Sequence, residues 1–179
     1  WTRRNSRGVT SWAMSLESAR LAFRPPRLAD AGPLFEFLGD SEAMRLTTVQ
    51  ASERDCRRFL AAHERQRRRV HCAPWVIIER QTNRTIGFGG LYEDPFDPGW
   101  GIEIGYFLSP GAWGRGFATE LALFCVNWAK QQEHWQTITA FAHPENLASQ
   151  RVLQKSGFRE ERFVPEMNRL LYRRGLAGN

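Results

Sequence analysis

The sequence predicts a single α/β domain with seven strands and four helices. The chain has 179 residues, which suits one domain and is too short for two ordinary domains. Short runs with the two-residue period of strands alternate with longer runs that have the helical period. Turns rich in glycine, proline and asparagine separate these runs.

Composition limits the class of protein. Hydrophobic residues make up 42% of the chain and charged residues 25%, which is a globular composition. No run of about 18 apolar residues occurs, so we expect no transmembrane helix. The three cysteines are too few for a disulfide framework and favour reduced thiols in a cytoplasmic protein.

Residues 1–13 lack the apolar segment of a secretory signal. We expect a tag, an upstream extension or a disordered arm there, and the domain at residues 14–179.

The chain is basic. Its net charge of +6 fits an anionic partner, such as a polyphosphate cofactor or a nucleic acid. Seven arginines lie between Arg54 and Arg69, but Glu53, Asp55 and Glu64 are interleaved with them. A solvated helix face with i,i+4 ion pairs explains that pattern better than nucleic-acid binding does.

The first three elements are a strand and two helices. Residues 20–24 alternate in character and end at Pro25-Pro26, as a short strand does. Asp30 can cap a helix that runs to about residue 38. A Ser-Asp capping box and an apolar stripe at helical spacing predict a second helix over residues 52–69.

Three strands follow. Residues 75–79 and 85–93 are apolar runs joined by a turn at residues 81–84, so they form a hairpin. A loop with two prolines covers residues 94–99, and residues 100–109 form the third strand. One face of this strand carries apolar and aromatic side chains: Ile102, Ile104, Tyr106 and Leu108.

The second half alternates strand and helix. A glycine-rich turn leads into a helix over residues 117–132, and residues 137–142 form the next strand, which gives the form of a βαβ crossover. Residues 146–156 form a helix that Gly157 ends. The last two strands are expected at residues 158–163 and 167–172.

The sharpest local signal is the glycine-rich turn, Ser-Pro-Gly-Ala-Trp-Gly-Arg-Gly-Phe-Ala-Thr-Glu at residues 109–120. Gly114 and Gly116 let the backbone adopt positive φ and approach a ligand closely. The N–H groups of residues 115–119 would point outward at the positive end of the helix dipole and cradle a pyrophosphate, and Arg115 adds a mobile charge. The glycines alone fit a plain strand-to-helix turn equally well.

Two other phosphate-binding loops are excluded. A Walker loop needs Gly-Lys-Ser/Thr, whereas Phe117 follows Gly116. A Rossmann fingerprint needs glycine or alanine at the position of Thr119 and an acidic residue after the next strand, near Phe141, and the chain has neither.

Two linked motifs resemble those of the GNAT acetyltransferases, most closely the branch that includes the ribosomal-protein N-terminal acetyltransferases RimJ and RimL. The first is Gly-x-Gly-x-Ala-Thr-Glu at residues 114–120, and the second is Asn-x-x-Ser…Lys-x-Gly-Phe within residues 146–158. Residues 20–30 and 104–108 are also similar. The resemblance covers residues from about 18 to 172 and points to acetyl-CoA binding rather than to a particular acceptor.

The resemblance implies a mixed, mostly antiparallel sheet of six to seven strands with about four helices, in which the central strands 100–109 and 137–142 splay apart. The pantetheine arm of acetyl-CoA, the acyl donor, would enter the gap and pair with the backbone of residues 107–109, where one N–H would polarise the acetyl carbonyl. The turn would hold the pyrophosphate, and Asn146 would contact the pantetheine. The residues expected to bind the cofactor are Phe107, Leu108, Ser109, Trp113, Gly114, Arg115, Gly116, Phe117, Ala118, Thr119, Asn146 and Ser149.

The chain departs from the family pattern at two positions. Gly111 stands where the phosphate motif often begins with Gln or Arg, so one side-chain donor is lost. Leu153 stands where many members have a tyrosine that protonates the leaving thiolate. Ser149 or a water molecule would take over that role.

The expected chemistry is direct attack of an amine on acetyl-CoA. An α-amino group, with a pKa of about 7.7–8, is partly neutral near physiological pH, whereas a lysine amine at about 10.4 is not, so a weak base suffices for an N-terminal substrate. Glu103, on the strand face opposite Ile104, is the candidate base, and Glu93 is the runner-up. The alternative role for Glu103 is an ion pair with an arginine. With Ser149 and Asn146 it makes up the expected catalytic set.

Three functions stay open. Acetylation of a protein or peptide N-terminal α-amino group is favoured. A small amine, such as an antibiotic or a polyamine, is the second acceptor class, and the acidic cluster of Glu93, Asp94 and Asp97 would suit it. The third function is an acyl-CoA-binding module without turnover, which Leu153 keeps open. The cysteines lack metal-ligand spacing, so no metal site is expected, and the assembly is expected to be a monomer or a homodimer.

Overall fold

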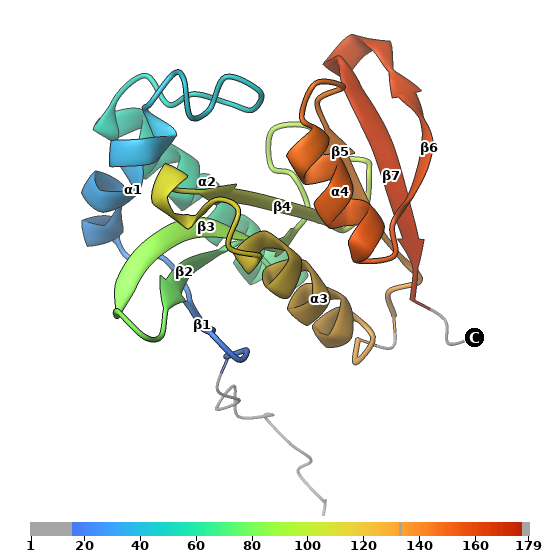
Figure 1. Ribbon diagram of the computed structural model, residues 1–179, viewed down its shortest axis with the longest axis horizontal. Coiled ribbons are helices and arrows are strands. Elements are labelled where there is room, and N and C mark those ends of the chain that lie inside the picture. The colour runs from blue at the N-terminus through green and yellow to red at the C-terminus, as the bar shows by residue number, and fades with distance from the viewer. Residues whose placement is uncertain (1–15, 133, 177–179) are drawn as a thin grey trace, which may run out of the picture.

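The computed structural model describes residues 16–132 and 134–176 (Figure 1). Its strands are β1 (Leu21–Arg24), β2 (Trp75–Glu79), β3 (Arg84–Tyr92), β4 (Glu103–Leu108), β5 (Thr137–Ala142), β6 (Arg159–Val164) and β7 (Arg169–Gly175). Its helices are α1 (Ala31–Leu38), α2 (Glu53–Val70), α3 (Phe117–Ala129) and α4 (Leu147–Lys155). Short 3₁₀ turns cover residues 28–30, 110–112 and 165–167. The expectation for residues 1–13 lies outside the described residues.

The seven strands form one sheet in the order β1-β2-β3-β4-β5-β7-β6. Neighbouring strands run antiparallel, except that β4 and β5 run parallel. The crossover through α3 makes this parallel pair. The mixed, mostly antiparallel sheet with seven strands and four helices is therefore confirmed.

The strand predicted over residues 100–109 begins later than expected, at Glu103. Gly99 and Gly101 have φ angles of 116° and 77°, in the region that favours glycine, so the chain turns there instead of extending. The helix predicted to reach residue 132 ends at Ala129. The other bounds agree with the sequence expectations to within a few residues.

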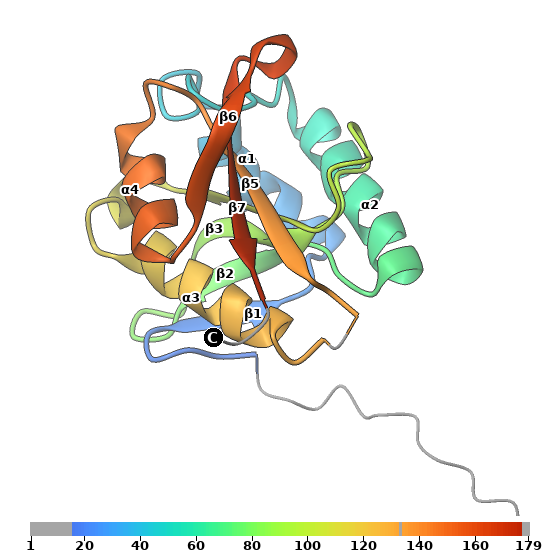
Figure 2. The ribbon, with the colours of Figure 1, turned by 90° about the vertical axis from the view of Figure 1, so that its right-hand side faces the viewer.

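Helices cover both faces of the half-sheet formed by β1 to β4 (Figure 2). Successive side chains of β2 point to opposite faces: Ile77 packs in the cluster that contains α3, and Val76 packs in the cluster that contains α1 and α2. α4 lies on the same side as α3 and packs against it and against β5. No helix within the described ranges is long and apolar enough to cross a membrane.

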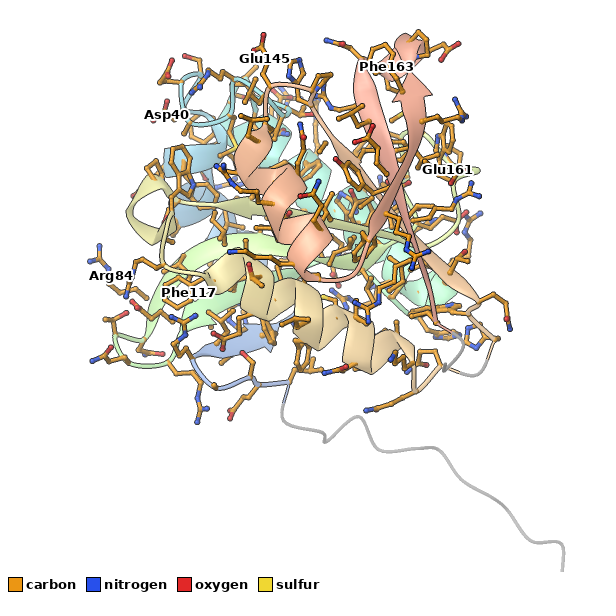
Figure 3. All side chains as sticks on the ribbon, turned by 45° about the vertical axis from the view of Figure 1, so that its right-hand side comes forward. Asp40, Arg84, Phe117, Glu145, Glu161 and Phe163 are labelled. Carbon is orange, nitrogen blue, oxygen red and sulfur yellow. The ribbon has the colours of Figure 1, made fainter. Side chains whose placement is uncertain are left out.

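The arginine-rich helix α2 presents a solvated, ion-paired face. Ser52 caps it, with its Oγ accepting the Asp55 N–H at 3.1 Å. Ion pairs at i,i+3 or i,i+4 spacing follow along the helix: Arg57–Glu53, Arg58–Asp55 and Arg67–Glu64. At the opposite end of the sheet, Glu161 and Phe163 project from the exposed edge strand β6 (Figure 3).

The sheet splits between β4 and β5. These strands pair at two positions, Glu103 with Thr139 and Ile104 with Ala140. Beyond Ile104, β4 continues along β3, whereas β5 continues along β7, and the two strands diverge (Figure 1). The predicted splay is confirmed, and it creates the gap around which the candidate site is built.

Candidate active site

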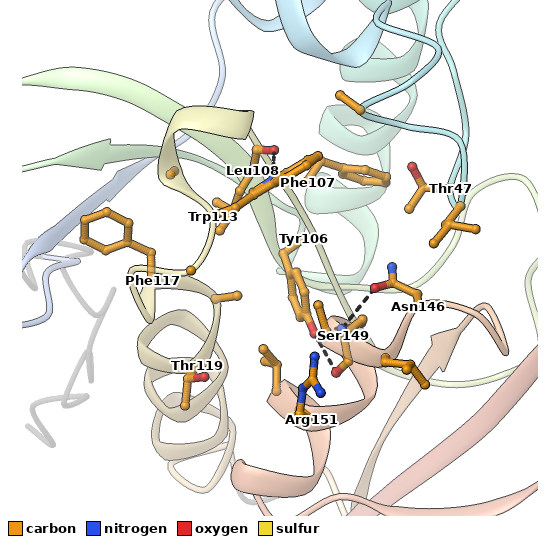
Figure 4. Close-up of a pocket in the computed structure, with 18 of the residues that line it drawn as sticks. Thr47, Tyr106, Phe107, Leu108, Trp113, Phe117, Thr119, Asn146, Ser149 and Arg151 are labelled. Atoms are coloured by element: carbon orange, nitrogen blue, oxygen red, sulfur yellow. Dashed lines mark hydrogen bonds between the residues drawn. The ribbon is translucent and has the colours of Figure 1, made fainter.

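A cavity of about 560 Å³ lies beside the diverging end of β4 (Figure 4). Its wall consists of the end of β4, the turn before α3, the start of α4 and residues 43–47. We call it the donor cavity, because it lies where the sequence resemblance places the pantetheine arm.

The turn before α3 has the predicted backbone conformation. Gly114 and Gly116 have φ angles of 71° and 80°, which strain any residue with a side chain. Gly116 is the N-cap of α3 and has no side chain to accept from the first N–H groups of the helix. The N–H groups of Ala112 and Trp113 already donate within the preceding 3₁₀ turn. The donors left for an anion therefore lie at the start of α3.

Most of the residues predicted to bind the cofactor line the donor cavity: Phe107, Leu108, Trp113, Gly114, Gly116, Phe117, Ala118, Thr119, Asn146 and Ser149. Ser109 does not line it. The Ser109 N–H donates to the Ile86 carbonyl oxygen at 2.9 Å, which directs it toward β3 and away from the gap. The expectation that this backbone group pairs with the pantetheine arm is therefore wrong.

Arg115 also turns away from the donor cavity. Its guanidinium forms an ion pair with Glu79, whose buried carboxylate needs a partner. It lies 4.6 Å from the centroid of the Phe117 ring, and Arg20 lies at the same distance from that ring. The sequence predicts a mobile charge at Arg115, but in the structure this charge is held by its contacts with Glu79 and Phe117.

Three other cations line the donor cavity and were not foreseen: Arg45, Arg151 and Lys155. Arg151 and Lys155 lie four residues apart, on one face of α4. Neither forms an ion pair with another residue of the described chain. In the sequence, the i,i+4 spacing of Arg151 and Lys155 indicates one basic face on this helix. Only the position of α4 beside the gap shows that this face borders the cavity.

Two hydroxyl groups meet in the donor cavity. The Tyr106 hydroxyl on β4 lies 3.0 Å from Ser149 Oγ on α4 (Figure 4). Asn146 caps α4, its Oδ1 accepting the Ser149 N–H at 3.0 Å, which leaves the Asn146 amide NH₂ group to face a ligand. Leu153 is buried in the core. The alternation of residues along the strand predicts the face of Tyr106, but no sequence pattern assigns it a role.

A second cavity, of about 610 Å³, lies on the other face of β4, against α2. Its wall contains the aromatic rings of Phe59, His63, Tyr92, Phe96 and Phe107, together with the charged side chains of Asp55, Arg58, Arg65 and Asp94. Burial, and then the charge of Arg67, lowers the pKa of His63 to about 4, so its imidazole is neutral. Phe107 lines both cavities, which therefore lie on either side of this residue.

Glu103 shares the strand face of Phe107 and is 5% exposed, although it lines neither cavity. Burial, and then the charges of Asp94 and Asp97, raise its pKa to about 8. Within the described part of the chain, no hydrogen bond or ion pair links the Glu103 carboxyl group to another side chain. The alternative role of Glu103, an ion pair with an arginine, is therefore not observed among the described residues.

Glu93, the second candidate base, is engaged. Its Oε2 accepts from Gln66 Nε2 at 3.1 Å and from Arg69 Nη2 at 3.3 Å. Two side-chain donors therefore already occupy the Glu93 Oε2 atom. Glu103 is therefore the better placed base of the two.

Metal chemistry finds no support in the described residues. Cys56, Cys72 and Cys125 are free and buried. Across residues 16–132 and 134–176, no group of three or more His, Cys, Asp or Glu side chains is arranged to hold a metal ion.

Comparison with known proteins identifies the family. Residues 20–159 match the acetyltransferase (GNAT) domain. The N-acetyltransferase YnaD of Bacillus subtilis (strain 168) is 25% identical over 151 residues, which cover 84% of this chain and 85% of that protein.

Two solved structures with different acceptors share the fold. RimL, a ribosomal L7/L12 α-N-protein acetyltransferase in complex with coenzyme A, matches with a TM-score of 0.74 at 16% identity, over 88% of this chain and 95% of its own. The aminoglycoside acetyltransferase AAC(6')-Ib in complex with coenzyme A matches with a TM-score of 0.70 at 18% identity, over 87% of this chain and 94% of its own.

Likeness at this level of identity shows the fold and selects neither an acceptor nor the RimJ/RimL branch. The family match, however, spans both sequence motifs and both splayed strands. The chain therefore belongs to the GNAT acetyltransferase family.

Proposed function

We propose that the protein transfers the acetyl group of acetyl-CoA directly to a primary amine, and that the preferred amine is a protein or peptide N-terminal α-amino group. The observation that carries this proposal is that Phe107 lines both cavities, which lie on opposite faces of β4. A thioester in one cavity and an amine in the other can meet without a covalent enzyme intermediate.

The donor cavity suits coenzyme A. The N–H groups at the start of α3 and the Arg151 and Lys155 cations favour the phosphates. The Ser109 N–H points to β3, and since backbone groups alternate along a strand, the Leu108 N–H faces the gap, where the pantetheine arm enters. The Asn146 NH₂ group is available to the same arm. Ser149 lies in the same wall and donates to the departing sulfur.

The second cavity would take the acceptor. Its aromatic wall suits an apolar side chain beside the amine, and its Asp55 and Asp94 carboxylates are balanced by Arg58 and Arg65, so the wall carries no net charge that would exclude a peptide. Glu103 then accepts the proton that the nitrogen loses, through a water molecule, since it does not line the cavity itself. A carboxylate with a pKa near 8 is well matched to an α-amino group with a pKa of about 7.7–8.

Two observations bear on the acceptor. The likeness to RimL supports a protein N-terminus, and the likeness to AAC(6')-Ib supports a small amine as the second candidate. The matched pKa values favour the N-terminus, because a lysine-like amine would need a much stronger base. The RimJ/RimL branch and a cytoplasmic location remain predictions.

A thiol-release assay with acetyl-CoA and an amine panel tests the proposal. The panel pairs one lysine-containing peptide with the same peptide blocked at its N-terminus, and adds spermidine and an aminoglycoside. We expect release with the free peptide and loss of release on blocking. Faster release with spermidine or the aminoglycoside would select the second acceptor class. Coenzyme A binding without release for any amine would indicate a module without turnover.

A further inference from the structure

The departing thiolate needs a hydrogen-bond donor, and four side-chain hydroxyl groups line the donor cavity: Thr47, Tyr106, Thr119 and Ser149. Thr47 Oγ1 already donates to the Met44 carbonyl oxygen at 3.1 Å. Thr119 belongs to the first turn of α3, where the phosphates are expected (Figure 4). Tyr106 and Ser149 remain, and they are hydrogen-bonded to each other at 3.0 Å.

The direction of that hydrogen bond decides what the pair can do. Ser149 has one hydroxyl proton, and if it donates to Tyr106, none is left for a ligand. The Tyr106 hydroxyl reaches two Ser149 oxygens, Oγ at 3.0 Å and the carbonyl oxygen at 3.4 Å, and Oγ is the nearer. If Tyr106 donates to Ser149 Oγ, the Ser149 proton is free to point into the cavity. Burial raises the pKa of Tyr106 to about 12, so its hydroxyl keeps its proton throughout the physiological range. Tyr106 is therefore always able to act as the donor.

We propose that Tyr106 is a positioning residue, whose hydroxyl donates to Ser149 Oγ and thereby directs the Ser149 hydroxyl proton to the sulfur of coenzyme A. This inference rests on the proposed function, because it concerns the leaving group of the same transfer. The Asn146 cap holds the Ser149 backbone, and the Tyr106 hydrogen bond holds its side chain. Donors in such a chain also polarise one another, which strengthens the bond to an anion.

The transfer step balances without a proton from Tyr106. The amine nitrogen forms a bond to the acetyl carbon, the carbon–sulfur bond breaks, and its electron pair stays on sulfur. The proton that the nitrogen loses goes to Glu103. The thiolate leaves within the Ser149 hydrogen bond and takes a proton from water after release, since an aliphatic thiol has a pKa of about 8.5.

A purely structural role is the alternative, because Tyr106 also packs against the apolar core. Tyr106→Phe keeps the ring and removes the hydroxyl. Tyr172→Phe is the matched control, since Tyr172 is a buried tyrosine on β7 that lines neither cavity and whose hydroxyl donates to Glu160 at 3.1 Å. Thermal unfolding of both variants shows whether either substitution disturbs the fold.

The first test compares two acyl donors in single-turnover reactions. We expect Tyr106→Phe to slow transfer from acetyl-CoA by about tenfold, the value of one hydrogen bond, with little change in the acetyl-CoA concentration that gives half the maximal single-turnover rate. With the acetyl thioester of 4-nitrothiophenol, whose acidic thiol leaves readily without a donor, the rate should stay close to that of the wild type. Tyr172→Phe should leave both rates unchanged.

If Tyr106→Phe slows transfer from both acyl donors equally, the inference is overturned, because the effect of a packing defect does not depend on the leaving group. Ser149→Ala and the double variant give a further check. If Tyr106 acts through Ser149, adding Tyr106→Phe to Ser149→Ala should cost nothing more. Additive losses would show that the two hydroxyl groups act independently.

The second test needs no turnover. The affinities for coenzyme A and for desulfo-coenzyme A are measured from neutral to alkaline pH. The ratio of the two affinities gives the contribution of the thiol to binding. We expect the ratio to favour coenzyme A increasingly as pH rises in the wild type, because the donor pair stabilises the bound thiolate, and to do so less in Tyr106→Phe. Identical ratios in the two proteins would overturn the inference. A difference without acetyl transfer to any amine would instead refute the proposed function alone.

Discussion

Glu103 lies opposite Thr139 at the closed end of the split between β4 and β5. The Thr139 N–H donates to the Ile102 carbonyl oxygen at 2.9 Å, and the Thr139 hydroxyl lies 3.1 Å from both the Ile102 and the Trp100 carbonyl oxygens. These bonds fasten the two strands where the pairing ends. The candidate base is therefore held at the rigid end of the gap, and the donor cavity lies at its open end.

Replacing Glu103 by Gln should change the pH dependence of catalysis. A base must be deprotonated to act, so kcat/KM of the wild type should rise with pH and level off near the raised pKa of about 8. Glu103→Gln should lower kcat/KM by roughly 10²-fold and flatten the part of this limb that the base causes. Initial rates with a peptide acceptor across this range check the prediction.

Glu93→Gln is the comparison variant, because Glu93 is the other candidate. Its loss should leave the limb in place. If kcat/KM still rises with pH in Glu103→Gln but no longer rises in Glu93→Gln, then Glu93 is the base and Glu103 is not.

The same substitution should stabilise the protein at alkaline pH. The folded-state pKa of Glu103 lies above the unfolded value of about 4.3, so the folded state binds this proton more tightly. Its stabilising contribution is complete below about pH 4.3 and is lost as pH rises through 8, where a buried charge must be carried. Glu103→Gln carries no charge and avoids that loss.

We therefore expect the free energy of unfolding of Glu103→Gln to exceed that of the wild type by a few kcal/mol above pH 8, with a smaller difference at low pH. Urea unfolding at several pH values measures it. A difference that does not vary with pH would show that Glu103 has an ordinary pKa.

Gly116→Ala should weaken coenzyme A binding. Gly116 has a φ of 80°, which costs a residue with a side chain about 1–2 kcal/mol. Relaxation of the turn would move the N–H groups at the start of α3.

Gly111→Ala is the matched control, since Gly111 lies in the preceding 3₁₀ turn and its φ is not positive. No atom lies within 4 Å of a Cβ added at Gly111. Calorimetric titration should give about a tenfold higher Kd for Gly116→Ala and no change for Gly111→Ala. Equal affinities for both would remove the turn from the phosphate site.

Neutralising the cations of α4 should weaken binding through the phosphates. Arg151→Gln and Lys155→Gln should each raise the Kd for coenzyme A severalfold at low ionic strength, with a smaller effect at high salt. Arg68→Gln on α2 makes the same change in net charge far from the donor cavity and should leave the Kd unchanged. A similar rise in Arg68→Gln would indicate a general charge effect rather than a site.

Local patterns predict the elements of this fold well, and long-range contacts explain what they miss. The capping residue Ser52 acts as the sequence predicts, because its partner Asp55 lies three residues away. The partner of Arg115, by contrast, is Glu79 on β2, and no local pattern links them. The pairing of β5 with β7 instead of β6 is equally invisible along the chain.

The site follows the same rule. The glycine turn could be predicted because its chemistry is local. The hydroxyl pair could not, because 43 residues separate Tyr106 from Ser149, and only the splayed sheet brings them together. Glu103 was found from its strand face, but its raised pKa depends on burial and on Asp94 and Asp97 in a neighbouring loop.

A crystal structure with coenzyme A and a peptide bearing a free N-terminus tests the central claim most directly. We predict the diphosphate at the N–H groups of residues 116–119, the thiol beside Ser149, and the peptide amine in the second cavity, with Phe107 between the two ligands. Coenzyme A bound away from the glycine turn, or a peptide that cannot reach the thiol past β4, would contradict it.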